Sequence, residues 1–317
     1  MPGTPLHRPT ASAIRVRRLP MALCLFVCAL AASAAADEFT LPPDDVDLIG
    51  RLRTVKARHE DTLLDIARRN DLGRDEIVAA NPGVDPWLPG AGREILLPTR
   101  FILPPGPRRG LVLNLPEMRL YYYLPGQGGR PGRVVTHPVA IGRMDWQTPL
   151  GETRIVAKQK DPVWHPPASL KREALEKGET LPDRVPAGPD NPLGTRALRL
   201  GVPGYLLHGT NKPYGVGMRV SHGCIRLYPE DIEALFDQVP VGTPVRIVDQ
   251  PVKLGWLADT LFIEVHPPLA EEAHRDLRRQ ALERVYAELA RHPAVLDGAA
   301  LKRALRERRG IPVPITR

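Results

Sequence analysis

The sequence predicts a β-rich α+β protein, and three patterns support this class. Short runs rich in Val, Ile, Leu, Thr and Tyr, bounded by Gly and Pro, fill residues 110–249. A strand–helix–helix–strand pattern precedes them, and charged amphipathic helices follow them. Because the 317 residues exceed the roughly 100–200 residues of one ordinary domain, we expect two or three folded units.

The first 36 residues have the organisation of an export signal. Arginines precede an apolar run from Leu19 to Ala32, and Ala34-Ala35-Ala36 supplies the small residues at which a signal peptidase cleaves. The apolar run is shorter than the roughly 20 residues that cross a bilayer. We therefore expect a signal peptide over residues 1–36, cleavage near Ala36 and a soluble periplasmic protein, although a start at Met21 would remove the arginines.

Net charge gives only weak information about partners. The signal segment carries four arginines and no acidic residue, so its removal lowers the formal net charge from +8 to +4. This small excess does not require a nucleic acid, and we expect no nucleic-acid partner. It suits a wall polymer that bears carboxylates.

Residues 53–98 form a compact predicted unit. Residues 37–52, before it, are acidic and lack periodicity, so we expect a mobile lead-in or an edge without a fold of its own. The unit itself predicts an extended segment at 53–57, helices at 61–70 and 74–80, and a closing strand at 94–97. Asp61 is the expected N-cap of the first helix, and Asn81-Pro82-Gly83 ends the second.

Residues 109–249 predict a sheet and one helix. The strands are expected at 111–115, 119–123, 133–141, 152–160, 197–200, 205–208 and 245–248. Pro229 begins a helix that runs to Gln238 with an apolar face. The long segment after Lys160 has little regular periodicity, and a loop of this length is more often functional or disordered than decorative.

Residues 250–317 predict a C-terminal strand and a helical tail. The strand is expected at 261–265 and the helices at 270–291 and 299–309. Their arginines could form a patch for a polyanion, but acidic residues are interspersed with them. A solvated helix face is therefore the better interpretation.

Cys224 is the candidate nucleophile. Cys24 and Cys28 lie in the signal segment, so the processed chain keeps a single thiol. Structural cysteines of exported proteins come in pairs, which makes a lone thiol either an inert core residue or a reactive group. Its setting, Ser221-His222-Gly223-Cys224-Ile225-Arg226, favours reactivity, and a nearby imidazole is expected to lower the thiol pKa from about 8.5.

His208 is the candidate general base for Cys224. The strand predicted to end at His208 leads into a glycine turn, and residues 221–226 are expected to return beside it. The amides of Gly223 and Cys224 could then point at a developing oxyanion. Arg226 would supply a cation for a substrate carboxylate.

Two other interpretations compete with a catalytic cysteine. A lone cysteine is often a buried core residue. His208, His222 and Cys224 could also bind a metal, but no further cysteine pair completes a zinc site. We therefore expect no metal and no cofactor, and two histidines with different roles.

These residues resemble the catalytic signature of the L,D-transpeptidases with a YkuD-type domain. The resemblance rests on His208-Gly209-Thr210 and on residues 221–226 with their spacing. The segments 148–152 (Thr-Pro-Leu-Gly-Glu) and 191–194 (Asn-Pro-Leu-Gly) also match family patterns, so the resemblance spans roughly residues 109–249.

Residues 53–98 resemble a LysM module, a small glycan-binding unit of cell-wall proteins. The resemblance rests on residues 59–67 and 77–82, although Glu60 stands where glycine is usual. The module could contact glycan or only orient its neighbour, because a fold does not establish a function. The order of LysM-like module, catalytic domain and helical tail is similar to the ErfK/YbiS/YcfS/YnhG branch of the family.

The resemblance implies a YkuD-like β-sandwich and a specific reaction. Cys224 would attack the carbonyl at the L-centre of diaminopimelate in a peptidoglycan tetrapeptide stem, release D-Ala and form a thioester, which makes the enzyme a carbapenem target. His208 would transfer the proton with its ring oriented by the Gly209 carbonyl, and Ser221 and His222 would shape the pocket with Arg226.

The resemblance also suggests the acceptor of the acyl group. The branch favours the C-terminal Lys of an outer-membrane lipoprotein, and a second diaminopimelate would instead give a 3-3 crosslink. Two other classes stay open: a wall-peptide hydrolase that uses water, and a non-catalytic wall-binding scaffold in which Cys224 is dispensable.

Overall fold

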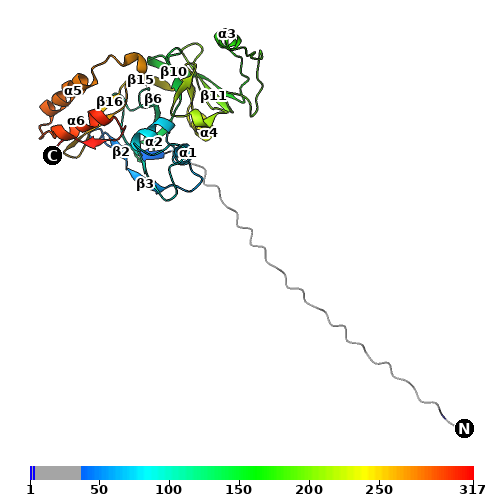
Figure 1. The fold of residues 1–317 in the computed structure, drawn as a ribbon, viewed down its shortest axis with the longest axis horizontal. Coiled ribbons are helices and arrows are strands. Elements are labelled where there is room, and N and C mark those ends of the chain that lie inside the picture. The colour runs from blue at the N-terminus through cyan, green and yellow to red at the C-terminus, as the bar shows by residue number, and fades with distance from the viewer. Residues whose placement is uncertain (2, 4–36) are drawn as a thin grey trace. The chain divides into compact units, whose positions relative to one another are not determined.

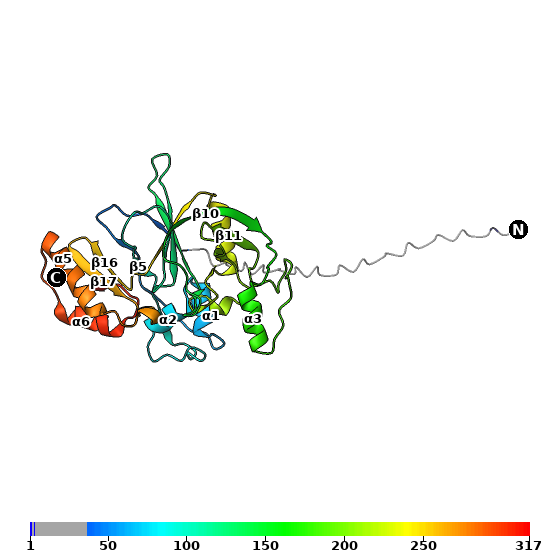
Figure 2. The same cartoon turned by 90° about the horizontal axis from the view of Figure 1, so that it is seen from above.

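The computed structural model describes residues 37–317, together with Met1 and Gly3. The expected signal peptide, with Cys24 and Cys28, lies outside the described residues. Within them, no helix combines the length and apolarity that a membrane crossing requires. This part of the chain is β-rich and contains six α-helices. Figures 1 and 2 show how these elements are arranged.

A nine-stranded sheet is the framework of the structure. Its strands lie in the order β1 (Asp37–Thr40), β8 (Arg133–Pro138), β7 (Arg119–Leu124), β6 (Gly110–Asn114), β15 (Pro244–Val248), β10 (Gly151–Lys160), β11 (Arg196–Leu200), β12 (Leu206–His208) and β14 (Ile225–Arg226). The predicted strands of residues 109–249 are confirmed, except that the strand expected over 133–141 ends at Pro138. Residues 141–142 form a separate strand, β9 (Ile141–Gly142), which pairs with β13 (Arg219–Ser221).

The long strand β10 curls this sheet. Its first half pairs with β15 and its second half with β11, and the register shifts between Ile155 and Ala157. An irregularity of this kind bends a strand and increases its twist. The structure thus has one curled sheet where two stacked sheets of a sandwich were expected.

Both faces of β7 are buried, which explains its continuous apolar sequence. Leu120 and Tyr122 enter one core together with side chains of α4 (Pro229–Gln238). Tyr121 and Tyr123 enter a second core, which they share with residues of the segment 49–103. Successive side chains of a strand point to opposite faces, so the two cores lie on opposite sides of the sheet.

The lead-in of residues 37–52 is built into the sheets. β1 pairs with β8 at the edge of the large sheet, and β2 (Leu48–Gly50) pairs with β5 (Arg100–Ile102). The prediction of an edge is confirmed, whereas the prediction that this segment lacks a fold is wrong. Its partners are distant in sequence, and pairing with distant strands leaves no local periodicity.

The LysM-like module has the predicted order of elements: β3 (Arg53–Lys56), α1 (Leu63–Arg69), α2 (Arg74–Ala80) and β4 (Glu94–Leu97), with β3 paired to β4. The N-cap of α1 is Thr62, and the prediction of Asp61 is wrong. Thr62 and Asp65 form a capping box in which each side chain accepts from the other residue's amide. Asp61 instead accepts from the Arg58 amide and pairs with Arg69.

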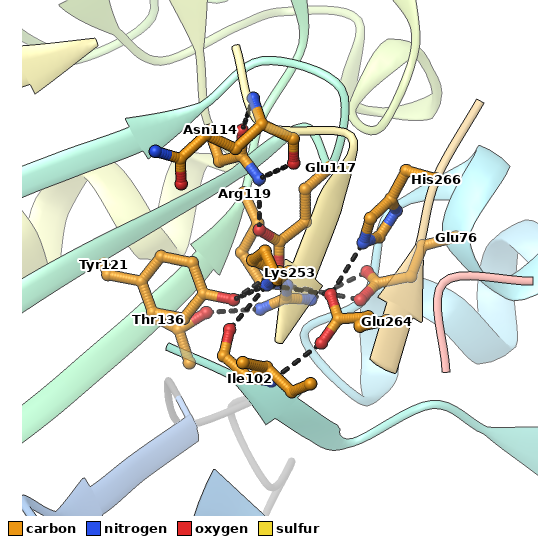
Figure 3. Close-up of polar contacts among 11 residues, drawn as sticks. Glu76, Ile102, Asn114, Glu117, Arg119, Tyr121, Thr136, Lys253, Glu264 and His266 are labelled. Carbon is orange, nitrogen blue, oxygen red and sulfur yellow. Dashed lines mark hydrogen bonds and ion pairs between the residues drawn. The ribbon is translucent and has the colours of Figure 1, made fainter. Parts of the chain in front are cut away.

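A buried ion pair attaches this module to the sheet (Figure 3). The Arg119 guanidinium of β7 is fully buried and lies 2.7 Å from the Glu76 carboxylate of α2. It also donates to the Thr136 hydroxyl at 2.7 Å and to the Asp71 carbonyl at 3.0 Å. Together with the second core, these contacts hold the module and the sheet as one packed unit.

The C-terminal region adds a three-stranded sheet of β16 (Val252–Leu257), β17 (Thr260–Val265) and β18 (Val313–Pro314). The helices α5 (Leu277–Arg291) and α6 (Gly298–Glu307) share a core with this sheet. The predicted helix 270–291 begins only at residue 277, because Asp276 accepts from the Arg279 amide as its N-cap. Residues 270–272 form a separate 3₁₀ turn.

A second buried ionic cluster joins the C-terminal region to the large sheet (Figure 3). Lys253 Nζ lies 2.9 Å from a Glu117 oxygen and 2.8 Å from a Glu264 oxygen, and it donates to the Ile102 carbonyl at 2.6 Å. Glu264 also lies 2.6 Å from His266 Nε2. The cluster therefore already contains the cation that its two carboxylates need, and its role is to join strands.

Candidate active site

Cys224 and His208 face the same cavity. β12 and β14 are parallel neighbours in which His208 lies directly opposite Arg226. Cys224 immediately precedes β14, and residues two apart in an extended segment lie on the same face. Cys224, Arg226 and His208 accordingly line one cavity of about 440 Å³. The structure thus brings together the predicted nucleophile and the predicted base.

The opposite wall of this cavity comes from the long segment between β10 and β11. Trp164, His165 and Leu170 line it, and the segment contains the helix α3 (Ala168–Glu176), visible in Figures 1 and 2. The sequence analysis missed this helix. Its apolar residues are sparse and only Ala174 is buried, so the helix leaves a weak periodic signal.

The Asn-Pro-Leu-Gly motif anchors this wall beside His208. Asn191 is fully buried, and its Nδ2 donates to the Pro162 carbonyl at 2.7 Å. Gly194 packs directly on Gly209, because a Cβ at position 194 would lie 3.0 Å from Gly209 Cα. The motif therefore fixes the turn that follows His208, which accounts for its match to the family pattern.

The His208 imidazole is buried and neutral. Burial lowers its pKa to about 3, and the Arg226 cation acts in the same direction. His208 Nδ1 lies 2.7 Å from the Gly209 carbonyl oxygen, which is the contact that the resemblance implies for orienting the ring. A carbonyl only accepts, so Nδ1 carries the proton and Nε2 keeps the lone pair. His208 can therefore accept a proton at Nε2.

The pKa of the Cys224 thiol is raised, contrary to the prediction that an imidazole lowers it. Burial raises this pKa, and the main chain of Leu206 and the Arg226 cation only partly offset the effect. The neutral His208 ring provides no positive charge to stabilise a thiolate. Cys224 Sγ lies 3.6 Å from the Gly204 carbonyl oxygen and shares the cavity with the neutral His208 ring. A neutral thiol must lose its proton during nucleophilic attack.

Two side-chain hydrogen bonds to main-chain carbonyls fix the turn that presents Cys224. The Ser221 hydroxyl donates to the Cys224 carbonyl, and Thr148 Oγ1 donates to the Gly223 carbonyl at 2.9 Å. In a trans peptide the Cys224 N–H points opposite to the Gly223 carbonyl, and so away from Thr148. Gly223 has φ +97°, and a Cβ there would lie 2.9 Å from the Tyr205 ring, so the position requires glycine.

His222 and Arg226 also line the cavity, whereas Ser221, which was expected to shape the pocket, is fully buried and is not part of the cavity lining. His222 Nε2 lies 3.2 Å from Glu173 Oε2, and the His222 ring packs edge-on against Trp146 with centroids 5.4 Å apart. His222 thus contacts a carboxylate while His208 contacts a carbonyl, so the two histidines differ as expected. Among the described residues, the buried Arg226 Nε has no hydrogen-bond partner, and the Arg226 side chain lines the cavity.

The ligand set of the competing metal interpretation is not gathered in one place. Over residues 37–317, two groups of three His, Cys, Asp or Glu side chains bring their ligand atoms within 4.8 Å of one another. These groups are Asp71–His137–Asp231 and Glu117–Glu264–His266, and neither contains Cys224, His208 or His222.

Comparison with known proteins identifies the family. Residues 108–247 match the YkuD family model, which is described as an L,D-transpeptidase catalytic domain. The protein named "Probable L,D-transpeptidase ErfK/SrfK" of Salmonella typhimurium is 42% identical over 259 residues, which cover 80% of this chain and 82% of that protein. This chain belongs to the L,D-transpeptidase family.

A second relative of this L,D-transpeptidase is similar over almost its whole length. "Probable L,D-transpeptidase YcfS" of Escherichia coli is 38% identical over 296 residues, which cover 91% of each chain. Both relatives confirm the resemblance to the ErfK/YbiS/YcfS branch and the prediction of an enzyme. Among solved structures, L,D-transpeptidase 3 of Mycobacterium tuberculosis has a TM-score of 0.32 and 20% identity, covering 49% of this chain and 67% of that chain.

Two residues of this L,D-transpeptidase site were assigned no role by the sequence analysis. Thr148 lies in a motif that matches the family pattern, but its bond to the Gly223 carbonyl depends on a chain reversal that the motif does not reveal. Glu173 contacts His222 from α3, and the sequence shows only one acidic residue among many in a charged segment.

Proposed function

We propose that this L,D-transpeptidase forms a thioester between Cys224 and the carbonyl at the L-centre of diaminopimelate in a peptidoglycan tetrapeptide stem. The observation that carries the proposal is the cavity shared by Cys224 and a neutral His208 whose Nδ1 contacts the Gly209 carbonyl. The thiol proton passes to His208 Nε2 as the S–C bond forms. The same nitrogen returns a proton to the amine of D-Ala as the C–N bond breaks.

The loop before Cys224 would stabilise the oxyanion of this reaction. The amides of Gly223 and Cys224 are the donors that we propose, because the bonds from Ser221 and Thr148 fix the turn before the substrate arrives. Preorganised donors of this kind often contribute most of the rate enhancement in acyl transfer. Arg226, which lines the cavity, would bind a carboxylate of the stem peptide.

The second step needs an acceptor for the acyl group. We propose the side-chain amine of the C-terminal Lys of an outer-membrane lipoprotein, the acceptor that the resemblance of the sequence to the ErfK/YbiS/YcfS/YnhG branch implies. The amine nitrogen attacks the thioester carbonyl, the C–S bond breaks, and the amine proton returns to sulfur through His208. A second diaminopimelate would give a 3-3 crosslink, and water would make the enzyme a carboxypeptidase.

The acceptor is tested by product analysis. The purified enzyme is incubated with disaccharide-tetrapeptide and a peptide that ends in Lys, and the products are separated and weighed by mass spectrometry. The proposal predicts free D-Ala and a tripeptide–Lys conjugate. Dimers of stems alone would select 3-3 crosslinking, and free tripeptide alone would select a hydrolase. The absence of any product from the wild-type protein would favour the non-catalytic scaffold, and full activity of Cys224→Ala would remove Cys224 from the role of nucleophile.

We also propose that the enzyme acts in the periplasm after cleavage near Ala36 and that the LysM-like module contacts glycan. Deletion of the module is a poor test, because it would expose the second core of the sheet. Trp87 is 62% exposed in the loop between α2 and β4, so Trp87→Ala can be tested in the folded enzyme. Undiminished binding to purified sacculi would contradict glycan contact through this loop.

A further inference from the structure

The wall that α3 contributes to the cavity has little apolar anchorage. Only Ala174 of this helix is buried, and Pro167 at its N-cap makes no side-chain capping bond. Figure 1 shows α3 apart from the LysM-like module and from the C-terminal helices. A segment that buries few apolar contacts opens at a low cost in free energy. Its place beside the cavity therefore depends on specific polar contacts.

Glu173 of α3 supplies such contacts. Its Oε2 accepts from Arg143 Nη2 at 2.6 Å and lies 3.2 Å from His222 Nε2, while its Oε1 accepts from Lys177 at 2.7 Å. The hydrogen bond from Arg143 is the main cause that holds the pKa of Glu173 at about 2, so the carboxylate is ionised at physiological pH. His222 precedes Cys224 by two residues, so one carboxylate joins the helix to the catalytic loop.

The same contact fixes the tautomer and the orientation of His222. A carboxylate only accepts, so His222 Nε2 carries a proton. Burial and the Arg143 cation lower the pKa of His222, which keeps the ring neutral and leaves the lone pair on Nδ1. Trp146 packs edge-on against the ring at 5.4 Å, so the ring cannot turn without losing one of its partners.

We propose that Glu173 is a positioning residue that latches α3 over the substrate cavity and orients His222. This inference rests on the proposed function, because it assigns the latched wall to binding of the stem peptide. Leu170 of α3 and Trp164 line the cavity with Cys224, so the latch determines how closely this wall approaches the substrate. Loss of the latch should weaken substrate binding more than it slows attack by Cys224.

The variant Glu173→Gln tests the latch, and Lys177→Ala is its matched control. Glutamine keeps the length of the side chain but removes the charge that Arg143 and His222 contact. Lys177→Ala removes the third partner of Glu173 and leaves the other two. For Glu173→Gln we expect KM for the stem peptide to rise about tenfold, with kcat changed less than about threefold. We expect Lys177→Ala to match the wild type and Glu173→Asp to recover part of the loss.

Two further readouts need no turnover and so separate the latch from the proposed function. In Glu173→Gln, the α3 amides should exchange hydrogen faster, and the pKa of His222 by NMR should fall, because the carboxylate raises it. If the wild type leaves stem peptides unchanged, the proposed function fails while these readouts still decide the latch. The latch proposal would be overturned if Glu173→Gln kept the wild-type hydrogen exchange of the α3 amides and the wild-type pKa of His222. It would also be overturned if Lys177→Ala changed both quantities as much as Glu173→Gln does.

Discussion

The LysM-like module and the α3 wall are attached to the same sheet by different forces. The module buries Leu63, Ile66 and Ile77 completely, and its ion pair joins an Arg119 side chain that is 0% exposed to Glu76. The helix α3 itself buries only one alanine, and in its latch the Arg143 side chain is 33% exposed. Solvent screens an exposed pair far more than a buried one. The module is therefore held to the sheet more firmly than α3 is, and the helix beside the cavity can adjust to the substrate.

The largest expected effect is on catalysis at His208. In His208→Gln, the side chain keeps polar atoms but no longer accepts the thiol proton as a base. General acid–base catalysis contributes about 10²–10⁴-fold, so we expect kcat/KM to fall by about that factor. Circular dichroism and thermal melting should show a folded protein. A loss smaller than tenfold in a folded variant would remove His208 from the role of base.

The next effect is on stability at the module interface. Arg119→Met leaves the Glu76 carboxylate with a buried charge and no cation, which costs about 3–5 kcal/mol in the free energy of unfolding. Chemical denaturation measures this loss. Lys171→Ala removes the ion pair between α3 and Asp183, whose side chain is 98% exposed, and should leave the midpoint unchanged. Equal shifts in the two variants would contradict the contrast between the two regions.

A smaller effect is expected at Thr148, which holds the catalytic turn without lining the cavity. Thr148→Val keeps the shape but removes the hydroxyl that donates to the Gly223 carbonyl at 2.9 Å and accepts from the Gly142 amide at 3.1 Å. Loss of such a buried bond costs about 1–3 kcal/mol, so we expect a fall in kcat of about tenfold. Thr148→Ser retains the hydroxyl and should keep most of the activity, as steady-state kinetics can show.

The smallest effect is the expected response of the site to mild acid. His208 must be neutral to accept a proton, and its folded pKa of about 3 lies below its ordinary 6.5, so the base form persists until pH falls towards 3. Acylation rates should therefore change little between about pH 5 and 8.

The raised pKa of Cys224 predicts that the rate of alkylation by iodoacetamide increases about tenfold per pH unit from 7 to 9. An alkylation plateau at neutral pH would instead reveal a thiolate–imidazolium pair.

The sequence predicted the reacting groups better than it predicted their environment. Cys224, His208 and Gly209 belong to compact motifs, so their proximity follows from a strand, a turn and a returning segment. The direction of the Cys224 pKa shift depends on burial, which arises only when distant walls close around the thiol. No local sequence pattern around Cys224 indicates that these distant segments bury the thiol.

In the fold, too, the elements with a local sequence signal could be predicted, whereas the elements that depend on partners distant in sequence could not. Strands and helices with their own periodicity, such as β7 and α4, could be placed from sequence. The lead-in strand β1 has no such signal, because its partner β8 lies about a hundred residues away. α3 is stabilised by Glu173 contacts to other parts of the chain, and such contacts have no signature in a short helix with few apolar residues.

Intact-protein mass spectrometry of the enzyme during turnover tests the central claim most directly. The enzyme is mixed with tetrapeptide stem, or with a carbapenem that traps the acyl-enzyme, quenched in acid and digested to locate the adduct. The account predicts one adduct on Cys224, with the mass of the stem less D-Ala after the stem or of the whole carbapenem after the carbapenem, and none in Cys224→Ala. Release of D-Ala without any adduct, or an adduct on another residue, would contradict it.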